Sequence, residues 1–300
     1  MSRFALVVAL LACSACASTS ATRKDAAPEA AAEEAPAEEA PAEAAPAEEA
    51  PAAQSARNLN LADIPFAPFN PEKPEGINVY PITGNPKAGA FNAIVRLPAG
   101  YRSPLHSHTA NYTGIAMSEG MVHGTTADAA GTLPKWSHWV QPGGEAHVDA
   151  CESTEPCYLL VFFDGAVDMV PAEAPAAEPK VRLTRGDAIQ WVELKAGVQL
   201  AVIQGNPKEG AFHALFQFPA GMSTNVHTHS AAFAGALLSG TNQRGARAEQ
   251  LVTLTEGAVW SEPAGSPHME KCGAESNCIF AAAMDGPLDT KAVELTPAAE

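Results

Sequence analysis

The feature that most constrains the fold of this chain is a histidine pattern that occurs twice, at an offset of 121 residues. Each copy holds a His-x-His pair and a third histidine 39 residues after the pair, at His106, His108 and His147 and again at His227, His229 and His268. Side chains two apart on a β-strand share a face, so each pair presents two imidazoles together. A turn of Pro and Gly precedes each third histidine and can return it to the pair. We therefore expect two equivalent clusters of three imidazoles.

The repeat extends beyond the histidines. Residues 84–91 (GNPKAGAF) match 205–212 (GNPKEGAF), and a proline-rich stretch at 171–179 separates the two copies. Short β-branched and aromatic runs lie between Gly, Pro and Asn turns, whereas helical periodicity is scarce. The sequence therefore predicts an all-β protein with two homologous domains, at 58–177 and 178–300, each of a size expected for a single domain.

The N-terminus has the pattern of a secretory signal peptide at residues 1–12, with one arginine followed by a short apolar core. The run Leu10-Leu11-Ala12-Cys13 resembles the lipobox of bacterial lipoproteins, which implies cleavage before Cys13 and lipidation of its sulfur. Cys16 is the alternative acceptor, and a plain secretory signal is the alternative interpretation. By the same analogy, Ser14 favours sorting to the outer membrane of a bacterial envelope, facing the periplasm.

Residues 13–57 form a linker rich in Ala, Pro and Glu. Prolines recur every five residues from 36 to 51, too often for a helix to propagate. The glutamates repel one another, and no aromatic residue is present to form a core. We expect a disordered, semi-extended tether between the lipid anchor and the folded domains.

The chain is acidic, with a formal net charge of -16, and an acidic excess remains after the linker. Nucleic acid and anionic membrane surfaces are therefore not expected as partners. The lipid anchor is the one membrane contact we expect, because no later apolar run is long enough to span a bilayer. Assembly into a homo-oligomer is left open by the sequence.

The motifs around the histidines resemble those of the cupin superfamily. Its first motif is Gly, five residues, His-x-His, three or four residues, Glu, six residues and Gly, and its glycines are matched by Gly100, Gly120, Gly221 and Gly240. Its second motif, Pro-x-Gly-x-x-His, is matched by 142–147 and 263–268. The resemblance covers residues 58–300. Within the superfamily, the chain is most similar to bicupin-like bacterial proteins without an assigned reaction. It implies two tandem jelly-roll (double-stranded β-helix) barrels, a bicupin, with a divalent transition metal held by the three histidines of each barrel.

One position departs from the family pattern. The glutamate of the first motif is replaced by Thr113 in the first repeat and by Ala234 in the second, and neither can act as a carboxylate ligand. Each metal would then have three neutral imidazoles and open positions for water or substrate. Imidazole serves Zn, Cu, Fe and Ni alike, and Mn also stays open, so the ligands do not select the metal. The alternative is a polar barrel interior that holds no metal.

Neighbouring residues distinguish the two repeats. The first repeat has Arg102, Tyr112 and His123 near its motif, where the second has Ser223, Phe233 and the pair Gln243-Arg244. The first site is therefore the better candidate for chemistry or for a charged ligand, unless these residues simply lie at the surface. His138 and His213 have no counterpart histidine, and we interpret them as surface or packing residues. Trp139 and Trp260 are equivalent in the repeat, which favours a packing role.

Two cysteine pairs occupy equivalent positions directly after the third histidines, at Cys151 and Cys157 and at Cys272 and Cys278. Each pair brackets a short turn, as if it joined the two strands of a hairpin. The signal peptide indicates an oxidising compartment, where disulfides persist. We therefore predict two hairpin disulfides. Soft metal ligands are the alternative, although the C-x5-C spacing is poor for zinc.

Together these features predict a lipid-anchored periplasmic bicupin that binds a divalent transition metal in each barrel and presents it to a small-molecule ligand. One alternative is a three-histidine metal-dependent dioxygenase or a related oxidoreductase. Another is a non-catalytic sensor or carrier of a metal or ligand. The sequence identifies no catalytic residue and leaves open whether the protein is an enzyme.

Overall fold

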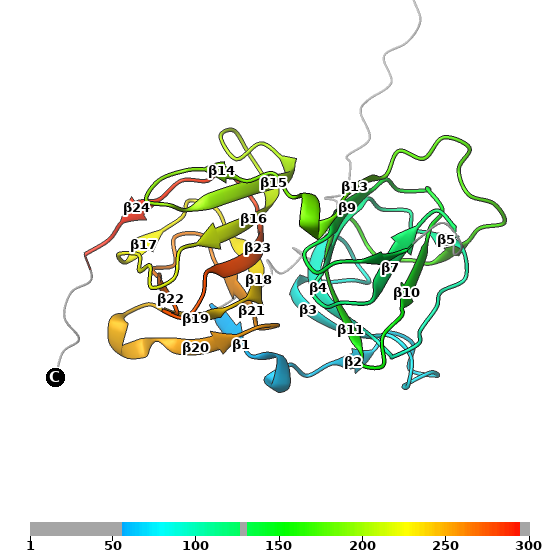
Figure 1. Ribbon diagram of the computed structural model, residues 1–300, viewed down its shortest axis with the longest axis horizontal. Coiled ribbons are helices and arrows are strands. Elements are labelled where there is room, and N and C mark those ends of the chain that lie inside the picture. Colours follow the sequence, from blue (N-terminus) through cyan, green and yellow to red (C-terminus); the bar gives the residue numbers. More distant parts are fainter. Residues whose placement is uncertain (1–55, 127–130, 295–300) are drawn as a thin grey trace, which may run out of the picture. The chain divides into compact units, whose positions relative to one another are not determined.

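The computed structural model of the protein describes residues 56–126 and 131–294 (Figure 1). The predicted signal peptide, the candidate lipidation sites Cys13 and Cys16, and all but the last two residues of the predicted linker lie outside the described residues. Those interpretations therefore stay predictions. Within the described ranges, no helix is long and apolar enough to cross a membrane.

The described chain is built almost entirely from β-strands, which confirms the all-β expectation. Its helical content is limited to single 3₁₀ turns, at η1 (Leu61–Asp63), η2 (Gly186–Ala188) and η3 (Ala248–Gln250). The strands fall into two sets of three antiparallel sheets, and each strand of one set has a counterpart in the other.

Barrel 1 consists of one large sheet and two small ones (Figure 1). In spatial order, the large sheet contains β13 (Arg182–Thr184), β9 (His138–Gln141), β6 (Tyr112–Ala116), β11 (Cys157–Phe163), β4 (Phe91–Leu97), β3 (Asn78–Gly84) and β2 (Ala67–Pro68). One small sheet contains β10 (Val148–Cys151), β7 (Met121–Gly124) and β8 (Thr132–Leu133). The other pairs β12 (Val170–Pro171) with β5 (His106–Ser107).

Barrel 2 repeats this arrangement strand for strand. Its large sheet contains β1 (Arg57–Leu59), β21 (Val259–Glu262), β18 (Phe233–Ser239), β23 (Cys278–Met284), β16 (Phe212–Phe218), β15 (Gln199–Gly205) and β14 (Val192–Glu193). One small sheet contains β20 (Val252–Thr255), β19 (Thr241–Gly245) and β22 (Met269–Cys272), and the other pairs β17 (His227–Thr228) with β24 (Lys291–Ala292).

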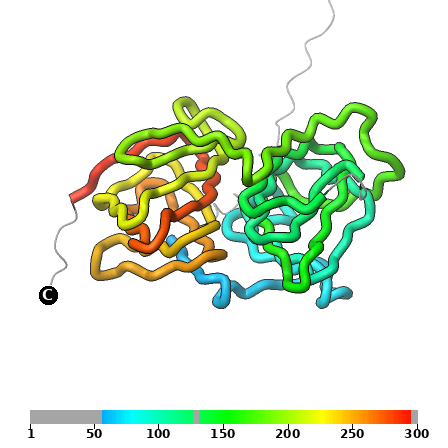
Figure 2. The backbone as a smooth tube through the Cα atoms, in the orientation of Figure 1, coloured from blue at the N-terminus to red at the C-terminus, as the bar shows by residue number. Residues whose placement is uncertain are grey.

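The first strand of each repeat is exchanged between the barrels. β1 comes before all strands of barrel 1 but pairs with β21 of barrel 2, with Asn58 opposite Trp260. Conversely, β13 begins the second repeat but pairs with β9 of barrel 1, with Leu183 opposite Trp139. In Figure 2 the blue segment after β1 runs from barrel 2 to the cyan strands of barrel 1. The predicted boundary at residue 178 therefore divides the sequence repeat, whereas the sheets themselves cross it.

The large sheets are buried on both faces. Along β11, Leu159 and Phe163 belong to the apolar cluster inside barrel 1, whereas the alternating Leu160 and Phe162 belong to a cluster that also contains Leu215 of barrel 2. Neighbouring side chains of a strand point to opposite faces. One face therefore fills the barrel while the other packs against the second barrel, which explains why these strands are continuous apolar runs in the sequence.

The two tryptophans have the predicted packing role. Trp139 and Trp260 are fully buried in the cores of barrel 1 and barrel 2. A Cβ added to Gly114 would lie 2.4 Å from the indole ring of Trp139, and one added to Gly235 would lie 2.7 Å from that of Trp260. These glycines are therefore required for the tryptophans to pack against the sheet.

Both predicted disulfides are formed. Cys151 is bonded to Cys157 and Cys272 to Cys278, with Cα–Cα distances of 5.6 and 5.7 Å. They join β10 to β11 and β22 to β23, directly after the third histidine of each repeat. With their sulfurs in disulfide bonds, these cysteines are not metal ligands.

Candidate metal centres

In barrel 1 the structure brings the three predicted histidines together. His106 lies on β5, and an isolated bridge pairs its backbone with that of His147, each N–H donating to the other residue's carbonyl. The rings of these two residues are 4.4 Å apart, and the ring of His108 lies 5.0 and 5.2 Å from them. One ring nitrogen from each residue lies within 4.8 Å of the other two. The turn after Pro142 thus returns the third histidine to the pair, as the sequence predicts.

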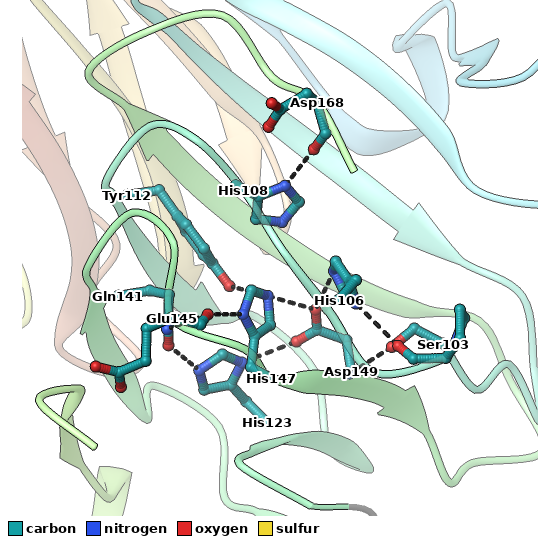
Figure 3. Close-up of polar contacts among 11 residues, drawn as sticks. Ser103, His106, His108, Tyr112, His123, Gln141, Glu145, His147, Asp149 and Asp168 are labelled. Carbon is teal, nitrogen blue, oxygen red and sulfur yellow. Dashed lines mark hydrogen bonds and ion pairs between the residues drawn. The ribbon is translucent and has the colours of Figure 1, made fainter. Parts of the chain in front are cut away.

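Backbone carbonyls fix the orientation of each imidazole (Figure 3). The Nδ1–H groups of the three histidines donate to the carbonyls of Pro104 at 3.0 Å, of Asp168, and of Glu145 at 3.2 Å. A carbonyl only accepts, so each Nδ1 carries the proton and each Nε2 keeps its lone pair. Burial lowers the pKa of His108, and lowers that of His147 to about 4. His108 and His147 are therefore neutral near pH 7, with an unprotonated Nε2.

The triad of barrel 2 has the same construction. The Nδ1–H groups of His227, His229 and His268 donate to the carbonyls of Asn225, Asp289 and Ser266, respectively. Burial lowers the pKa of all three, that of His268 to about 3. The Nε2 atom of His268 is buried without a hydrogen-bond partner among the described residues. A buried lone pair facing two others fits a metal ion, because metal-binding histidines use one ring nitrogen while the other is held by a carbonyl or carboxylate.

The structure corrects the position assigned to the missing glutamate. Thr113 points away from the triad, and its hydroxyl contacts Nδ1 of His213 in barrel 2 at 2.7 Å. The preceding residue, Tyr112, faces the triad and donates its hydroxyl hydrogen bond to Nε2 of His147 at 3.1 Å. In barrel 2 the equivalent Phe233 lies 5.4 Å from the ring of His268. The family motif permits three or four residues between the His-x-His pair and the glutamate. Three residues place the glutamate position at Tyr112, on the inward face of the strand, and four place it at Thr113, on the outward face.

Sequence reasoning missed a carboxylate beside the first triad. Oδ2 of Asp149 lies 3.6 Å from Nε2 of His147 and 3.9 Å from Nε2 of His106 (Figure 3). Its Oδ1 accepts a hydrogen bond from Nδ1 of His123 at 2.9 Å, and Nε2 of His123 faces Oε1 of Gln141 at 3.1 Å. Burial would raise the pKa of Asp149, but the His123 hydrogen bond and the neighbouring imidazoles lower it well below its usual range. The sequence did contain a signal for Asp149, because it lies two residues after His147 and side chains two apart share a strand face.

Of the three supporting residues predicted for the first site, two lie beside the triad. Tyr112 contacts His147 directly, and His123 holds Asp149. Arg102 does not belong to the site, because its side chain is about half exposed and pairs with Glu152 at 2.6 Å. The first site therefore lacks the cationic side chain that the sequence predicted for binding a charged ligand.

The two histidines without counterparts have packing roles. His138 is buried, and its Nδ1–H donates to the carbonyl of Trp136 at 3.1 Å. His213 packs against Phe162 of barrel 1, with ring centroids 4.8 Å apart, and burial lowers its pKa to about 4.

Barrel 2 has a charged network where barrel 1 has the His123–Asp149 pair. At the positions of His123, Gln141 and Asp149, the second repeat has Arg244, Glu262 and Glu270. Arg244 is fully buried, bonds Oε1 of Glu270 through Nη1, and lies 3.6 Å from Oε1 of Glu262 through Nη2. Its guanidinium lies over the ring of Trp260, 4.5 Å from the centroid. Burial lowers the pKa of Arg244 to about 10, which still leaves it cationic at neutral pH.

A cavity opens beside each triad. The cavity of barrel 1 has a volume of about 90 Å³, and apolar side chains such as Val95, Leu159 and Phe163 form most of its lining. No lysine or arginine lines it, and its charged residues are Asp149 and Asp168. The cavity of barrel 2 is larger, at about 540 Å³, and its lining includes a cation, Lys195, as well as Glu270.

Comparisons with known proteins agree with this architecture. The family described as Domain of unknown function (DUF4437) matches residues 82–291. A candidate dioxygenase from Nostoc punctiforme superposes with a TM-score of 0.65 at 12% identity, covering 81% of this chain and 88% of its own. Salicylate 1,2-dioxygenase from Pseudaminobacter salicylatoxidans gives 0.57 at 12% identity, with 79% and 87% covered. Protein YlbA from E. coli gives 0.56 at 13% identity, with 80% and 93% covered. A search of curated proteins found no match.

At these identities the superpositions are evidence for the fold, and they confirm the cupin architecture predicted from the two motifs.

Proposed function

The chain belongs to the DUF4437 family, and on that premise we propose that its two cupin barrels each bind one divalent transition metal and that barrel 1 presents its metal to a small-molecule ligand. Imidazole suits Zn, Fe, Ni and Cu, and Mn stays a candidate as well.

This proposal rests on the three imidazoles of each barrel, whose unprotonated nitrogens point toward one another. In each barrel three imidazoles have their Nδ1–H groups held by backbone carbonyls, and their remaining nitrogens lie within 4.8 Å of one another. Lowered histidine pKa values keep these nitrogens unprotonated near neutral pH. Four of the six histidines are buried, namely His106, His147, His227 and His268. Nε2 of His268 has no hydrogen-bond partner among the described residues, which would be costly if no metal were bound there.

A divalent metal bound at the first triad supplies a Lewis acid for an oxygen or sulfur donor of the ligand. Tyr112 adds a hydroxyl that is already directed at the triad, through its hydrogen bond to His147. Burial raises the pKa of Tyr112 well above its usual value, so the hydroxyl keeps its proton and can donate it to a ligand oxygen as a hydrogen bond. The walls around this contact are mostly apolar.

The cavity of barrel 1 favours a small uncharged ligand. Its volume of about 90 Å³ is below the roughly 150 Å³ of an apolar cavity that holds benzene. Its lining contains no lysine or arginine to pair with a carboxylate, and its two charged side chains are both acids. We therefore propose an apolar molecule, or an apolar end of one, that carries a single oxygen or sulfur donor.

Metal content is the first test. We expect up to two divalent ions per chain in protein isolated from its native envelope, measured by inductively coupled plasma mass spectrometry. The double variant His106→Ala with His108→Ala should retain one ion, as should His227→Ala with His229→Ala. Full metal content in either double variant would contradict the proposal.

A dioxygenase or related oxidoreductase is the second candidate, favoured by the apolar-lined cavity with a hydroxyl donor beside the triad. The Fe²⁺-loaded protein would then consume oxygen with an uncharged substrate, and a carboxylate-bearing analogue of equal size would be a poor substrate. Ligand binding without oxygen consumption would instead favour a sensor or carrier.

We also propose that the protein is a lipoprotein anchored at Cys13 and facing the periplasm, because Leu10-Leu11-Ala12-Cys13 resembles a lipobox. In that case Cys13→Ser should move the protein from the membrane to the soluble envelope fraction, whereas Cys16→Ser should not. The reverse result would assign the lipid to Cys16.

A further inference from the structure

The two triads differ in the carboxylate that stands two residues after the third histidine. In barrel 1 this residue is Asp149, which has one oxygen facing the triad and the other on His123. In barrel 2 it is Glu270, whose Oε1 is bonded to Arg244. In both triads the three Nδ1–H groups are held by backbone carbonyls, so a difference in the protein ligands lies in whether this carboxylate is free to meet a metal.

The distances in barrel 1 approach those of a shared coordination sphere. Ligand atoms that each lie about 2.1 Å from one metal are separated by roughly 3.0–3.5 Å in tetrahedral or octahedral geometry. Oδ2 of Asp149 is 3.6 and 3.9 Å from the Nε2 atoms of His147 and His106. Both distances are slightly longer than this range, so Oδ2 must move toward the triad to reach a metal bound by the three histidines.

The hydrogen bonds of Asp149 suit that role. Its Oδ1 is held by Nδ1 of His123, and the His123 ring stacks on Trp139 with centroids 4.2 Å apart. The backbone N–H of Asp149 donates to the hydroxyl of Ser103 at 2.9 Å. A carboxylate with one oxygen fixed in this way presents its other oxygen in a constant direction, as metal-binding carboxylates with hydrogen-bonded partners do.

In barrel 2 the network around Arg244 prevents the same use of Glu270. Arg244 is wholly buried and engages Glu270 and Glu262 together. Among the described residues, each triad forms a cluster of possible ligand atoms, and barrel 1 has a second cluster, of His123, His147 and Asp149, for which barrel 2 has no counterpart. Releasing Glu270 would leave the buried guanidinium with one fewer partner, which is costly.

We propose that Asp149 is the fourth protein ligand of the metal in barrel 1, and that Arg244 withholds Glu270 so that barrel 2 keeps a three-histidine site. The inference rests on the proposed function, because it requires that both triads bind metal. Barrel 1 then regains, from a different strand, the carboxylate that its first motif lacks. The formal charge at its metal falls from two to one, and its affinity rises accordingly.

Cobalt titration of single-barrel variants tests the proposal, because Co²⁺ absorption reports the number and type of ligands. In a background of His227→Ala with His229→Ala, where only barrel 1 binds, Asp149→Asn should weaken Co²⁺ binding by at least 10–100-fold and change the visible bands. Asparagine keeps the size of the side chain and an oxygen for His123. The control Asp164→Asn, at an exposed carboxylate that bonds Asn111, should change neither affinity nor spectrum.

An unchanged affinity and spectrum in Asp149→Asn would overturn the proposal and leave metal binding by the triads intact. A second comparison does not depend on that variant folding. The unmodified barrel 1 site and the unmodified barrel 2 site, each measured with the other triad removed, should give different Co²⁺ spectra. Identical spectra would overturn the assignment of Asp149. Absence of Co²⁺ binding in both backgrounds would overturn the proposed function as well.

Discussion

Barrel 1 and barrel 2 share their strand order, their disulfide and their histidine triad, yet they differ at the residues that touch the third histidine. Barrel 1 places the hydroxyl of Tyr112 and the carboxylate of Asp149 there. Barrel 2 places the ring of Phe233 there and binds its carboxylate to a buried arginine. The two repeats thus share the three histidines and differ in the polar residues around them. We therefore propose that ligand chemistry belongs to barrel 1 and that barrel 2 chiefly stabilises the molecule.

The largest expected difference between the barrels is in ligand binding. Removing the first triad through His106→Ala should abolish binding of a small uncharged ligand, because the donor atom loses its metal. The matched change His227→Ala should leave ligand affinity within a few fold. Isothermal titration of both metal-loaded variants measures the difference. Loss of binding in His227→Ala alone would reverse the roles of the two barrels.

The buried ion network of barrel 2 is the next largest contrast. Arg244→Ala leaves Glu262 and Glu270 without their common cation, and breaking a buried ion pair costs about 3–5 kcal/mol. His123→Gln in barrel 1 keeps a donor for Asp149, so its cost should be close to that of one hydrogen bond, about 1 kcal/mol. Urea unfolding of the two metal-free variants compares these costs. Equal losses would show that the charges around Arg244 add no special stability.

Acid should destabilise the metal-free protein through both triads. The folded-state pKa values of His147 and His268 are lowered to about 4 and about 3, below the ordinary value near 6.5. The unfolded state therefore binds more protons as pH falls below 6.5, and each histidine costs up to about 1.4 kcal/mol per pH unit until its folded pKa is reached. The melting temperature should fall steadily from pH 6.5 to pH 4. A flat profile over this range would contradict the buried, neutral state of the triads.

The disulfides should give the smallest difference between the two barrels. Replacing Cys151 and Cys157 by serine, or Cys272 and Cys278 by serine, opens a short loop worth about 2–3 kcal/mol in the chain-entropy account. Because the two loops have the same length, the two losses should agree within about 1 kcal/mol, as measured by thermal unfolding. A much larger loss in one barrel would show that its disulfide also supports the neighbouring triad.

Local patterns were sufficient to predict the triads and the disulfides. His106 and His108 share a strand face by alternation alone, and the turn after Pro142 is encoded next to His147. The fold could be predicted from the same repeat, because each strand pattern occurs in both copies and each copy supports the assignment of the other.

Features that depend on contacts between distant segments were not predicted. The motif spacing allowed either Tyr112 or Thr113 to face the triad, and the strand direction that decides between them was not evident from the residues. Arg102 is near the histidines in the sequence, but its side chain forms an ion pair with Glu152 outside the site. The exchanged strands β1 and β13 have three residues each, too few to show a repeat.

The exchange of β1 and β13 has a thermodynamic consequence. Each barrel lacks an edge strand without the other repeat, and one apolar cluster is common to both barrels. The described residues, 56–126 and 131–294, accordingly belong to one compact unit, so neither half can unfold while the other keeps its full sheet. Any ion that binds the native state adds RT ln(1 + [L]/Kd) to the stability of the whole cooperative unit. A metal held in barrel 2 therefore reduces the frequency with which the ligand site of barrel 1 opens, although the two sites share no residue.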